Sequence, residues 1–374
     1  MDTRRRLGGV ALLFLLNGII LGSWLPRLPE IRDNLGLGLA EVGLTLAVGG
    51  VGGLVGSAVS GLVVGRVGAR RSALVPALAL MALLPLVAAA PSAIALAAVI
   101  GAVAVVDAVA DVGMNALAAR VDEGRGHSIF NRLHGVWSLG SLLGAAASTV
   151  AVAIGVSLGA QLMGTAVAGL AAVIWASRLL PELDARPRPI ASKRRGVAIS
   201  LALAGLGAAF LEGTPSDWSA LYLTDVLDAS AATAGMGFLG LSAGMLIGRF
   251  GGDAVTDRLG MRSALMTGLT VVAVAVGITT VTTNVAVTLA GFTLWGLGVS
   301  VVLPMLYRQA GSQPGLGEGS GLAALTLGSR IGFLAGPAAV GSVAEMSALP
   351  VAIVGVMALA LIASVGAVIA SLGH

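Results

Sequence analysis

Two carboxylates and an amide recur at helical spacing within one long apolar stretch. Asp107, Asp111 and Asn115 are each four residues apart, so a helix over residues 92–120 would place all three on one face. Neighbouring carboxyls repel each other, and burial also disfavours their ionisation. Either group could therefore take up and release a proton near physiological pH. The spacing indicates a site for an exchangeable proton.

The same acids could instead be structural. A salt bridge would neutralise them and lock helix packing, and three basic residues are candidate partners: Arg120, Arg132 and Arg330. His134 begins the next apolar stretch at a depth comparable to Asp111. An Asp–His pair could relay a proton there, or the imidazole could merely cap its helix. We expect Asp111, together with Asp107 and His134, to bind and release the coupling proton.

Other polar and aromatic side chains within apolar stretches are candidates for contacting a small solute. They are Asn17, Asn115, Trp137, Glu212, Trp295 and Arg330. An indole face suits the apolar face of a sugar, although a buried Trp packed on small residues is equally common. Arg330 could bind an anion or pair with an acid. Glu212 is predicted near the outer end of its helix, as a gate or cavity acid.

Composition places all of these residues in a membrane. Of 374 residues, 57% are hydrophobic and only 11% are charged, and the mean hydropathy is +0.97. Soluble domains have about a quarter of their residues charged. A charge within such a chain is costly and usually functional. We therefore expect an all-α membrane protein embedded in a lipid bilayer.

Twelve apolar runs are long enough to cross a bilayer, which takes about 20 residues as a helix. They cover residues 7–26, 42–65, 73–90, 92–120, 133–154, 156–180, 196–216, 231–256, 263–282, 284–311, 319–341 and 347–371. The first run follows a basic start, as a signal peptide would, but it lacks a good cleavage site. We expect it to be an uncleaved first helix.

The basic residues predict the orientation. With the N-terminus inside, the cytoplasmic loops hold eighteen of the 22 basic residues, and the external loops hold only Arg27 and Arg32, each near an acid. Cytoplasmic loops characteristically carry this excess. We expect a multi-pass protein of the bacterial inner membrane with both termini cytoplasmic. The high pI of 10.5 follows from these loops and does not indicate a nucleic-acid partner.

An internal repeat divides the chain. Residues 66–70, Arg-Val-Gly-Ala-Arg, match residues 258–262, Arg-Leu-Gly-Met-Arg, at an offset of 192, and residues 138–144 match 326–332 at an offset of 188. Residues 181–196 are basic and rich in Pro. We expect two pseudo-symmetric six-helix bundles, 1–180 and 197–374, joined by a cytoplasmic linker over 181–196, with a solute path between them.

These motifs resemble those of the major facilitator superfamily. The family signature is Gly-x-x-x-Asp-Arg-x-Gly-x-Arg; residues 61–70 follow it with Gly65 in place of the acid, and residues 257–262 keep the acid. The resemblance implies alternating access and an inner gate of ion pairs. The residues expected to form this gate are Arg66, Arg70, Arg249, Asp253, Asp257, Arg258 and Arg262.

A finer resemblance is to the fucose-permease-like branch. Asp111-Val-Gly-Met-Asn115 and the polar stretch 131–140 are similar to that branch, although its helix-1 Asp is absent near Gly22. The resemblance places Asp111 at the coupling carboxylate and Trp137 at the substrate. It implies a proton-coupled secondary transporter of a small, sugar-like solute, expected to be a monomer.

Several other functions lack their motifs. The chain has no Cys, only three His, no P-loop and no His-Glu-x-x-His, so we expect no metal, no cofactor and no ATP-driven chemistry. A proton-driven exporter of drugs or metabolites remains the main alternative. An intramembrane enzyme acting on lipid is a remote one, because no hydrolytic or transfer motif is present.

Overall fold

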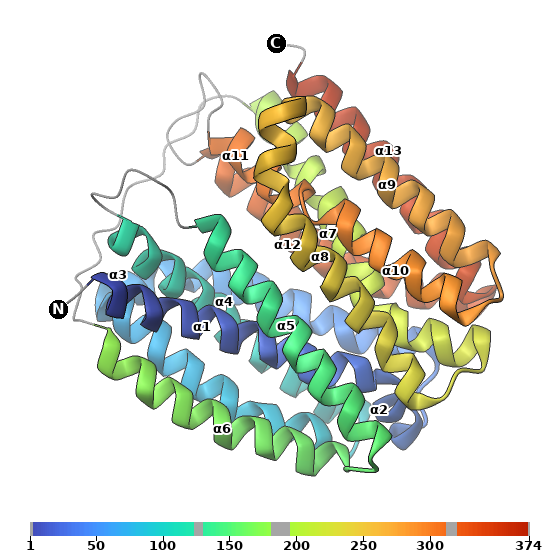
Figure 1. Cartoon of the computed structure of the whole chain (residues 1–374), viewed down its shortest axis with the longest axis horizontal. Coiled ribbons are helices and arrows are strands. Elements are labelled where there is room, and N and C mark those ends of the chain that lie inside the picture. Colours follow the sequence, from blue (N-terminus) through green and yellow to red (C-terminus); the bar gives the residue numbers. More distant parts are fainter. Residues whose placement is uncertain (1–2, 123–129, 181–194, 312–319, 373–374) are drawn as a thin grey trace.

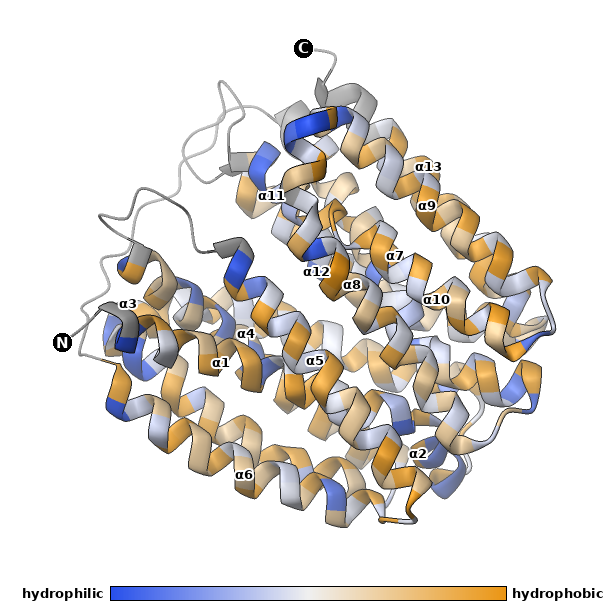
Figure 2. Ribbon diagram, viewed as in Figure 1, coloured by the Kyte–Doolittle hydropathy of each residue, from blue (hydrophilic) through white to orange (hydrophobic). Residues whose placement is uncertain are grey.

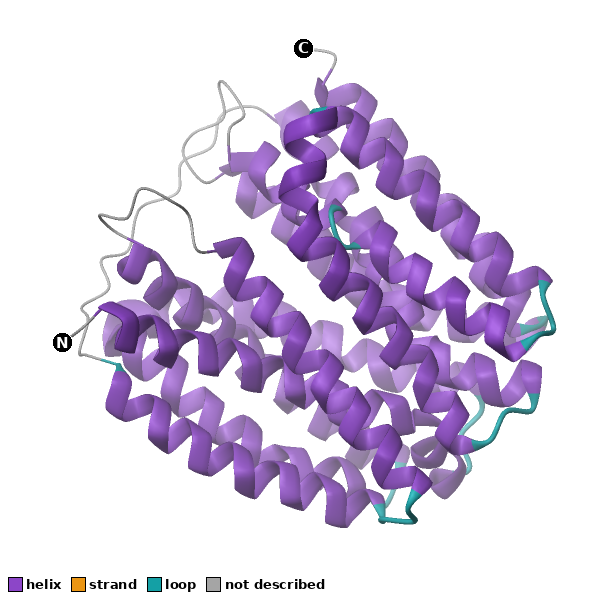
Figure 3. Ribbon diagram, in the orientation of Figure 1, coloured by secondary structure: helices purple, strands orange, loops and turns teal. Residues whose placement is uncertain are grey.

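The computed structural model describes residues 3–122, 130–180, 195–311 and 320–372, and every regular element in these ranges is a helix (Figure 3). The first group of helices is α1 (Thr3–Trp24), η1 (Leu25–Arg27), α2 (Leu28–Leu35), α3 (Leu39–Ala89), α4 (Ala93–Asp122), α5 (Phe130–Ala153) and α6 (Leu158–Leu179). The second group is α7 (Arg195–Leu227), α8 (Ala231–Leu259), α9 (Met261–Val281), α10 (Val285–Val299), α11 (Val302–Gly311), α12 (Ser320–Met346) and α13 (Leu349–Leu372). Most of the predicted linker, residues 181–194, lies outside the described ranges.

Hydropathy confirms the all-helical membrane class. Ten segments of the described chain are long and apolar enough to cross a bilayer, and apolar residues predominate along the helices (Figure 2). One of the ten, α3, has 51 residues and would measure about 77 Å as a straight helix, more than twice a bilayer's ~30 Å core. It contains two of the predicted spans, 42–65 and 73–90.

A glycine bends α3 between these two spans. Gly68 has φ 81° and ψ 160°, a backbone region open essentially only to Gly. Gly260, between α8 and α9, has almost the same angles, φ 77° and ψ 159°. The two glycines are the matched residues of the repeated motif, 192 positions apart. The sequence repeat therefore has a matching backbone bend.

Two predicted spans have different limits in the structure, and each contains a proline. The span expected to end at 216 continues to Leu227 in α7, through Pro215. The span expected over 284–311 is divided into α10 and α11. Pro304 lacks the N–H that would bond the Ser300 carbonyl, which accounts for the break at that point. Because α7 continues to Leu227, Glu212 lies midway along this helix, and its predicted place near the outer end of the helix is wrong.

Close glycine contacts hold the helices together. A Cβ added to Gly140 on α5 would overlap the Leu15 carbonyl oxygen of α1, and one added to Gly328 on α12 would overlap the Ala202 carbonyl oxygen of α7. Similarly, Gly52 on α3 meets Gly101 of α4, and Gly244 on α8 meets Thr293 of α10, at a constant offset of 192. In lipid, small residues at such points let helix backbones approach. Corresponding pairs of helices in the two groups thus pack through glycines at corresponding positions.

The two groups lie side by side and converge at one end. In Figure 1 the first group (blue to green) and the second (yellow-green to red) are closest near α2, which we name the α2 end. They diverge toward the end at which α1 begins and α13 finishes, which we name the terminus end. Contacts between the groups run mainly along α3 with α12 and α5 with α8.

The glycine contacts can be tested by adding one methyl group. Gly140→Ala and Gly328→Ala should each lower stability by about 1–3 kcal/mol, the usual cost of overpacking. Gly164→Ala on α6 is the matched control, because nothing lies within 4 Å of its added Cβ. Thermal unfolding of the purified proteins in detergent measures the difference. Equal melting temperatures for all three variants would contradict these close contacts.

Candidate functional site

Asn17, Trp137 and Asp107 form a hydrogen-bonded chain across three helices of the first group. The Trp137 indole N–H donates to Asn17 Oδ1 at 2.7 Å, and Asn17 Nδ2 donates to Asp107 Oδ1 at 2.6 Å. An indole N–H can only donate, so it orients the amide with its NH₂ toward the acid. Gly18 and Gly140, next to this chain, let α1 and α5 approach closely enough to form it.

The positive charge of Arg330, which comes from α12 in the other group, acts on both Asp107 and Asp111. The guanidinium lies within electrostatic range of both carboxyls, and the carboxyls lie within range of each other. Asn115 Nδ2 donates to Asp111 Oδ1 at 2.9 Å and also to the Asp111 carbonyl at 2.9 Å. Two acids therefore face one base across the interface between the groups.

Arg249 on α8 also crosses the interface. Its Nη1 donates to Ser138 Oγ of α5 at 2.5 Å. Its Cζ lies 5.2 Å from the centre of the Trp137 ring, within cation–π range. Its Nη2 lies 3.2 Å from Glu212 Oε1 of α7. The side chains of Arg249 and Glu212 are only 10% and 14% exposed. Each neutralises the charge of the other, and either charge would be costly to bury alone.

These contacts define a single assembly, which we name the interface cluster: Asn17, Asp107, Asp111, Trp137, Ser138, Glu212, Arg249 and Arg330. Its acids on α4 and its guanidiniums on α8 and α12 belong to different groups of helices. The cluster can therefore bind a proton or a polar solute where the groups meet. Rearrangement of the groups would change its ion pairs. Among the described residues no set of His, Asp and Glu is arranged to hold a metal ion.

Ser138 is the member that sequence reasoning missed. It lies in the repeated segment 138–144, where the sequence marks it as part of the repeat and not as a candidate for contacting a solute. Its neighbour in sequence, Trp137, was recognised. A hydroxyl one residue from a candidate tryptophan and at the start of a repeated motif was the available signal.

Two predicted residues lie beside the cluster. The His134 ring packs edge-on against Phe14, with centroids 5.6 Å apart, and lies within electrostatic range of Arg249. Trp295 is fully buried and its indole N–H donates to the Leu211 carbonyl at 3.0 Å. Pro215 has no backbone N–H to donate to this carbonyl, so the Trp295 indole supplies the donor instead. In this conformation Trp295 offers no surface to a solute.

The predicted gate residues are spread along the terminus end. Arg66, Asp257, Arg258 and Arg262 are exposed there. Arg70 donates to the carbonyls of Ser177 and Leu180 at the end of α6, within its own group. Arg249 belongs to the interface cluster. The side chain of Asp253 lies outside the described part of the chain. A gate role for these residues stays a prediction.

Comparison with known proteins identifies relatives over nearly the whole chain. The family model described as Major Facilitator Superfamily matches residues 10–312. An uncharacterised MFS-type transporter of Yersinia pestis is 29% identical over 343 residues, which are 91% of this chain and 89% of the relative. An uncharacterised transporter of Sinorhizobium fredii is 29% identical over 90% of both chains. The membrane protein MosC of Rhizobium meliloti is 26% identical over 96% of this chain and 88% of its own.

Solved structures share the fold. The nucleoside transporter NupG, crystallised as a D323A mutant, has a TM-score of 0.75 at 14% identity, covering 98% of this chain and 100% of its own. A bacterial homologue of the human lysosomal transporter Spinster, in an inward-facing and unoccupied conformation, has a TM-score of 0.78 at 15% identity, covering 99% of this chain and 97% of its own.

The pair formed by Arg249 and Glu212 can be tested through stability. Arg249→Ala should destabilise the protein by about 3–5 kcal/mol, because it leaves the Glu212 carboxylate buried without a partner. The double variant Arg249→Met, Glu212→Met should recover most of the loss, since it buries no charge. Ser138→Ala, which removes one acceptor of the same guanidinium, is the matched control and should cost much less. A double variant less stable than Arg249→Ala would contradict the pairing.

Proposed function

Because the chain belongs to the major facilitator superfamily, and is thus a membrane transporter rather than an enzyme, we propose that it moves a small solute by alternating access, coupled to protons. The observation that carries the proposal is the placement of two buried carboxyls, Asp107 and Asp111, within electrostatic range of one guanidinium, Arg330, from the opposite group of helices. One base balances one acid. The other acid is left to exchange a proton, or to bind a positive charge on the solute.

We further propose twelve spans in two bundles of six. The long helix α3 supplies two spans, separated at Gly68, and α10 with α11 supplies one. The 33 residues of α7 are long enough for another. The excess of basic residues in loops at the terminus end supports a cytoplasmic location for that end. The α2 end then faces outward from the inner membrane.

We assign the coupling proton to Asp111. Asp107 accepts a hydrogen bond from the amide of Asn17, whose orientation is fixed by the Trp137 indole. Asn115, the partner of Asp111, is on the same helix, and among the described residues no third side chain orients its amide. If this amide turned over, giving up its bond to the Asp111 carbonyl, its Oδ1 could accept a hydrogen bond from a protonated Asp111. His134 is a proposed exit for the proton toward the terminus end.

The proposed solute is neutral and rich in hydroxyls. With Glu212 paired to Arg249 and one acid of α4 balanced by Arg330, the cluster carries little net charge once Asp111 is protonated. Asn17, Asn115 and Trp137 then supply amide and indole groups suited to a sugar-like molecule. The assignment to the fucose-permease-like branch, and the monomeric state, remain predictions. A proton-driven exporter of lipophilic cations is the alternative that the binding test below distinguishes.

The exposed gate residues fit a cycle in which this conformer opens to the cytoplasm. Arg66, Asp257, Arg258 and Arg262 would form ion pairs only when the terminus end closes. On this basis the structure corresponds to an inward-facing state, and the closing of the terminus end would separate the groups at the α2 end.

Asp111→Asn tests the coupling. We expect proteoliposomes with this variant to lose accumulation of solute driven by a proton gradient while keeping solute exchange, because the amide cannot carry the proton. Asp228→Asn, an exposed position outside the cluster, should transport normally. The solute would come from a thermal-shift screen of sugars, organic acids and lipophilic cations. Undiminished uphill transport by Asp111→Asn would remove Asp111 from the mechanism.

The two internal tryptophans should separate binding from stability. Trp137→Ala should weaken binding of a sugar-like solute by roughly 1–3 kcal/mol, by analogy with aromatic platforms under nucleobases. Trp295→Phe should leave affinity unchanged and cost about 1–3 kcal/mol of stability, because the Leu211 carbonyl loses its donor. Calorimetric titration and thermal unfolding measure the two effects. Tight binding of a lipophilic cation, unaffected by Trp137→Ala, would favour the exporter.

A further inference from the structure

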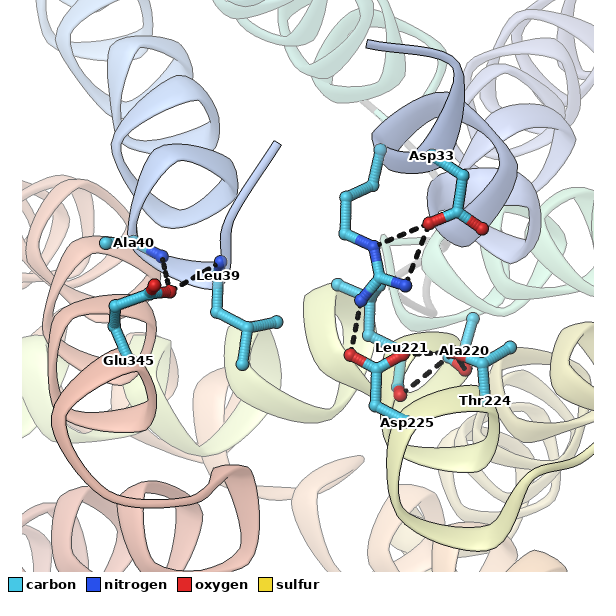
Figure 4. Close-up of polar contacts among 9 residues, drawn as sticks. Asp33, Leu39, Ala40, Ala220, Leu221, Thr224, Asp225 and Glu345 are labelled. Carbon is cyan, nitrogen blue, oxygen red and sulfur yellow. Dashed lines mark hydrogen bonds and ion pairs between the residues drawn. The ribbon is translucent and has the colours of Figure 1, made fainter. Parts of the chain in front are cut away.

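Polar side chains join the two groups of helices at the α2 end, far from the interface cluster. Arg32 on α2 forms an ion pair with Asp225 near the end of α7, and with its neighbour Asp33 at 2.9 Å (Figure 4). The side chains of Arg32 and Asp225 are 17% and 23% exposed. The pair is therefore partly shielded from water.

A carboxylate from the second group caps a helix of the first. Glu345 Oε2, near the end of α12, accepts hydrogen bonds from the backbone N–H groups of Leu39 at 2.9 Å and Ala40 at 3.3 Å (Figure 4). These are the first two residues of α3. The first N–H groups of a helix have no partner within it, and the helix dipole favours a negative charge there.

The beginning of α3 depends on this external cap because its own N-cap residue has no side chain. Four other helices that begin at the α2 end are capped by their own Ser or Asn: α4 by Ser92, α6 by Ser157, α8 by Ser230 and α10 by Asn284. The position of Ser230 in α8 corresponds to Gly38 in α3, at the offset of 192 that relates the two helices. Thus α8 is self-capped and its counterpart α3 is not.

We propose that Glu345 is a gate residue that closes the outer side of the transporter by capping α3 across the two groups, with the ion pair of Arg32 and Asp225 as a second latch. Opening at the α2 end removes Glu345 from α3, and Gly38 has no side chain to replace it. The outward-open state therefore carries uncapped N–H groups. The inference rests on the proposed alternating access. It names the residues that set the equilibrium between the inward-facing and the outward-open states.

A single reporter cysteine can measure this balance. Thr149 of α5 is 8% exposed and lies against Gly235 of α8, in the seam between the groups near the α2 end. Its hydroxyl has no hydrogen-bond partner among the described residues, so Thr149→Cys loses none of their contacts. The chain has no other Cys. The rate at which an external, membrane-impermeant maleimide labels the introduced thiol in intact cells then reports the fraction of molecules open to the outside.

In this background Glu345→Ala should raise the labelling rate roughly fivefold, the equivalent of losing one helix cap. Glu41→Ala is the matched control. Glu41 caps the same helix end, by accepting from the Gly38 N–H at 2.9 Å, but it belongs to the same group as α3. Its removal affects both states equally and should leave the labelling rate within about twofold of the parent.

Gly38→Ser provides an independent test. Serine supplies the missing N-cap, and its Cβ would lie 3.2 Å from Glu345 Oε2. The carboxylate would therefore have to shift, and the serine hydroxyl would compete with it for the first N–H groups of α3. The single variant should label faster than the parent, and adding Glu345→Ala to it should produce little further change. Asp225→Asn should also raise the rate, by a smaller factor because the pair is partly exposed.

Unchanged labelling in Glu345→Ala, or an equal rise in Glu41→Ala, would overturn the gate. Additive effects of Gly38→Ser and Glu345→Ala would do the same. These measurements need no transported solute. Failure to transport any solute would therefore count against the proposed function alone, whereas normal transport with unchanged labelling would count against the gate alone.

Discussion

The close approach of helix backbones at glycines is the constraint on which the rest of the structure depends. Lipid tails are as apolar as the helix surfaces, so helices gain little by hiding apolar area from lipid and associate instead through close packing and hydrogen bonds. Gly140 and Gly328 remove the side chains that would keep α1 from α5 and α7 from α12. Only at that spacing can short side chains such as Asn17 link neighbouring helices.

Charge then determines where the two groups of helices can meet. Isolated charges at membrane depth are costly, so Asp107 and Asp111 accept hydrogen bonds from amides of their own group, and the positive charge that acts on both comes from Arg330 of the other group. Such an interface is specific, but it can also be changed by a proton. Adding or removing one proton on an acid alters the attraction between the groups. An apolar interface would offer no comparable means of coupling.

Sequence reasoning predicted the membrane class, most helix positions and the acidic face of α4, because these depend on local composition and on helical spacing. It could not predict the partners of Arg249 or the burial of Trp295. In a soluble helix the apolar face marks the core, but here both the lipid-facing and the buried faces are apolar, so periodicity carries no such information. Pro215 shows the limit clearly. It lies inside α7, and the carbonyl that it leaves free is bonded by Trp295, which is distant in sequence.

The matched positions of the two groups suggest how a transporter arises from a repeat. The glycine contacts recur almost unchanged, at offsets of 187 to 192, whereas the charges of the interface cluster do not. On α10 and α11 the positions of Asp107 and Asp111 are taken by Val299 and Leu303. On the first group, the positions of Arg249 and Arg330 are taken by Ser57 and Leu142. The backbone scaffold is thus shared, while the acids of α4 and the guanidiniums of α8 and α12 are each unique to one group. The charges of the cluster therefore differ between the groups, whereas the packing does not. An electrostatic attraction acts across an interface whose two sides have the same backbone framework, and a proton bound on one side can change the strength of that attraction.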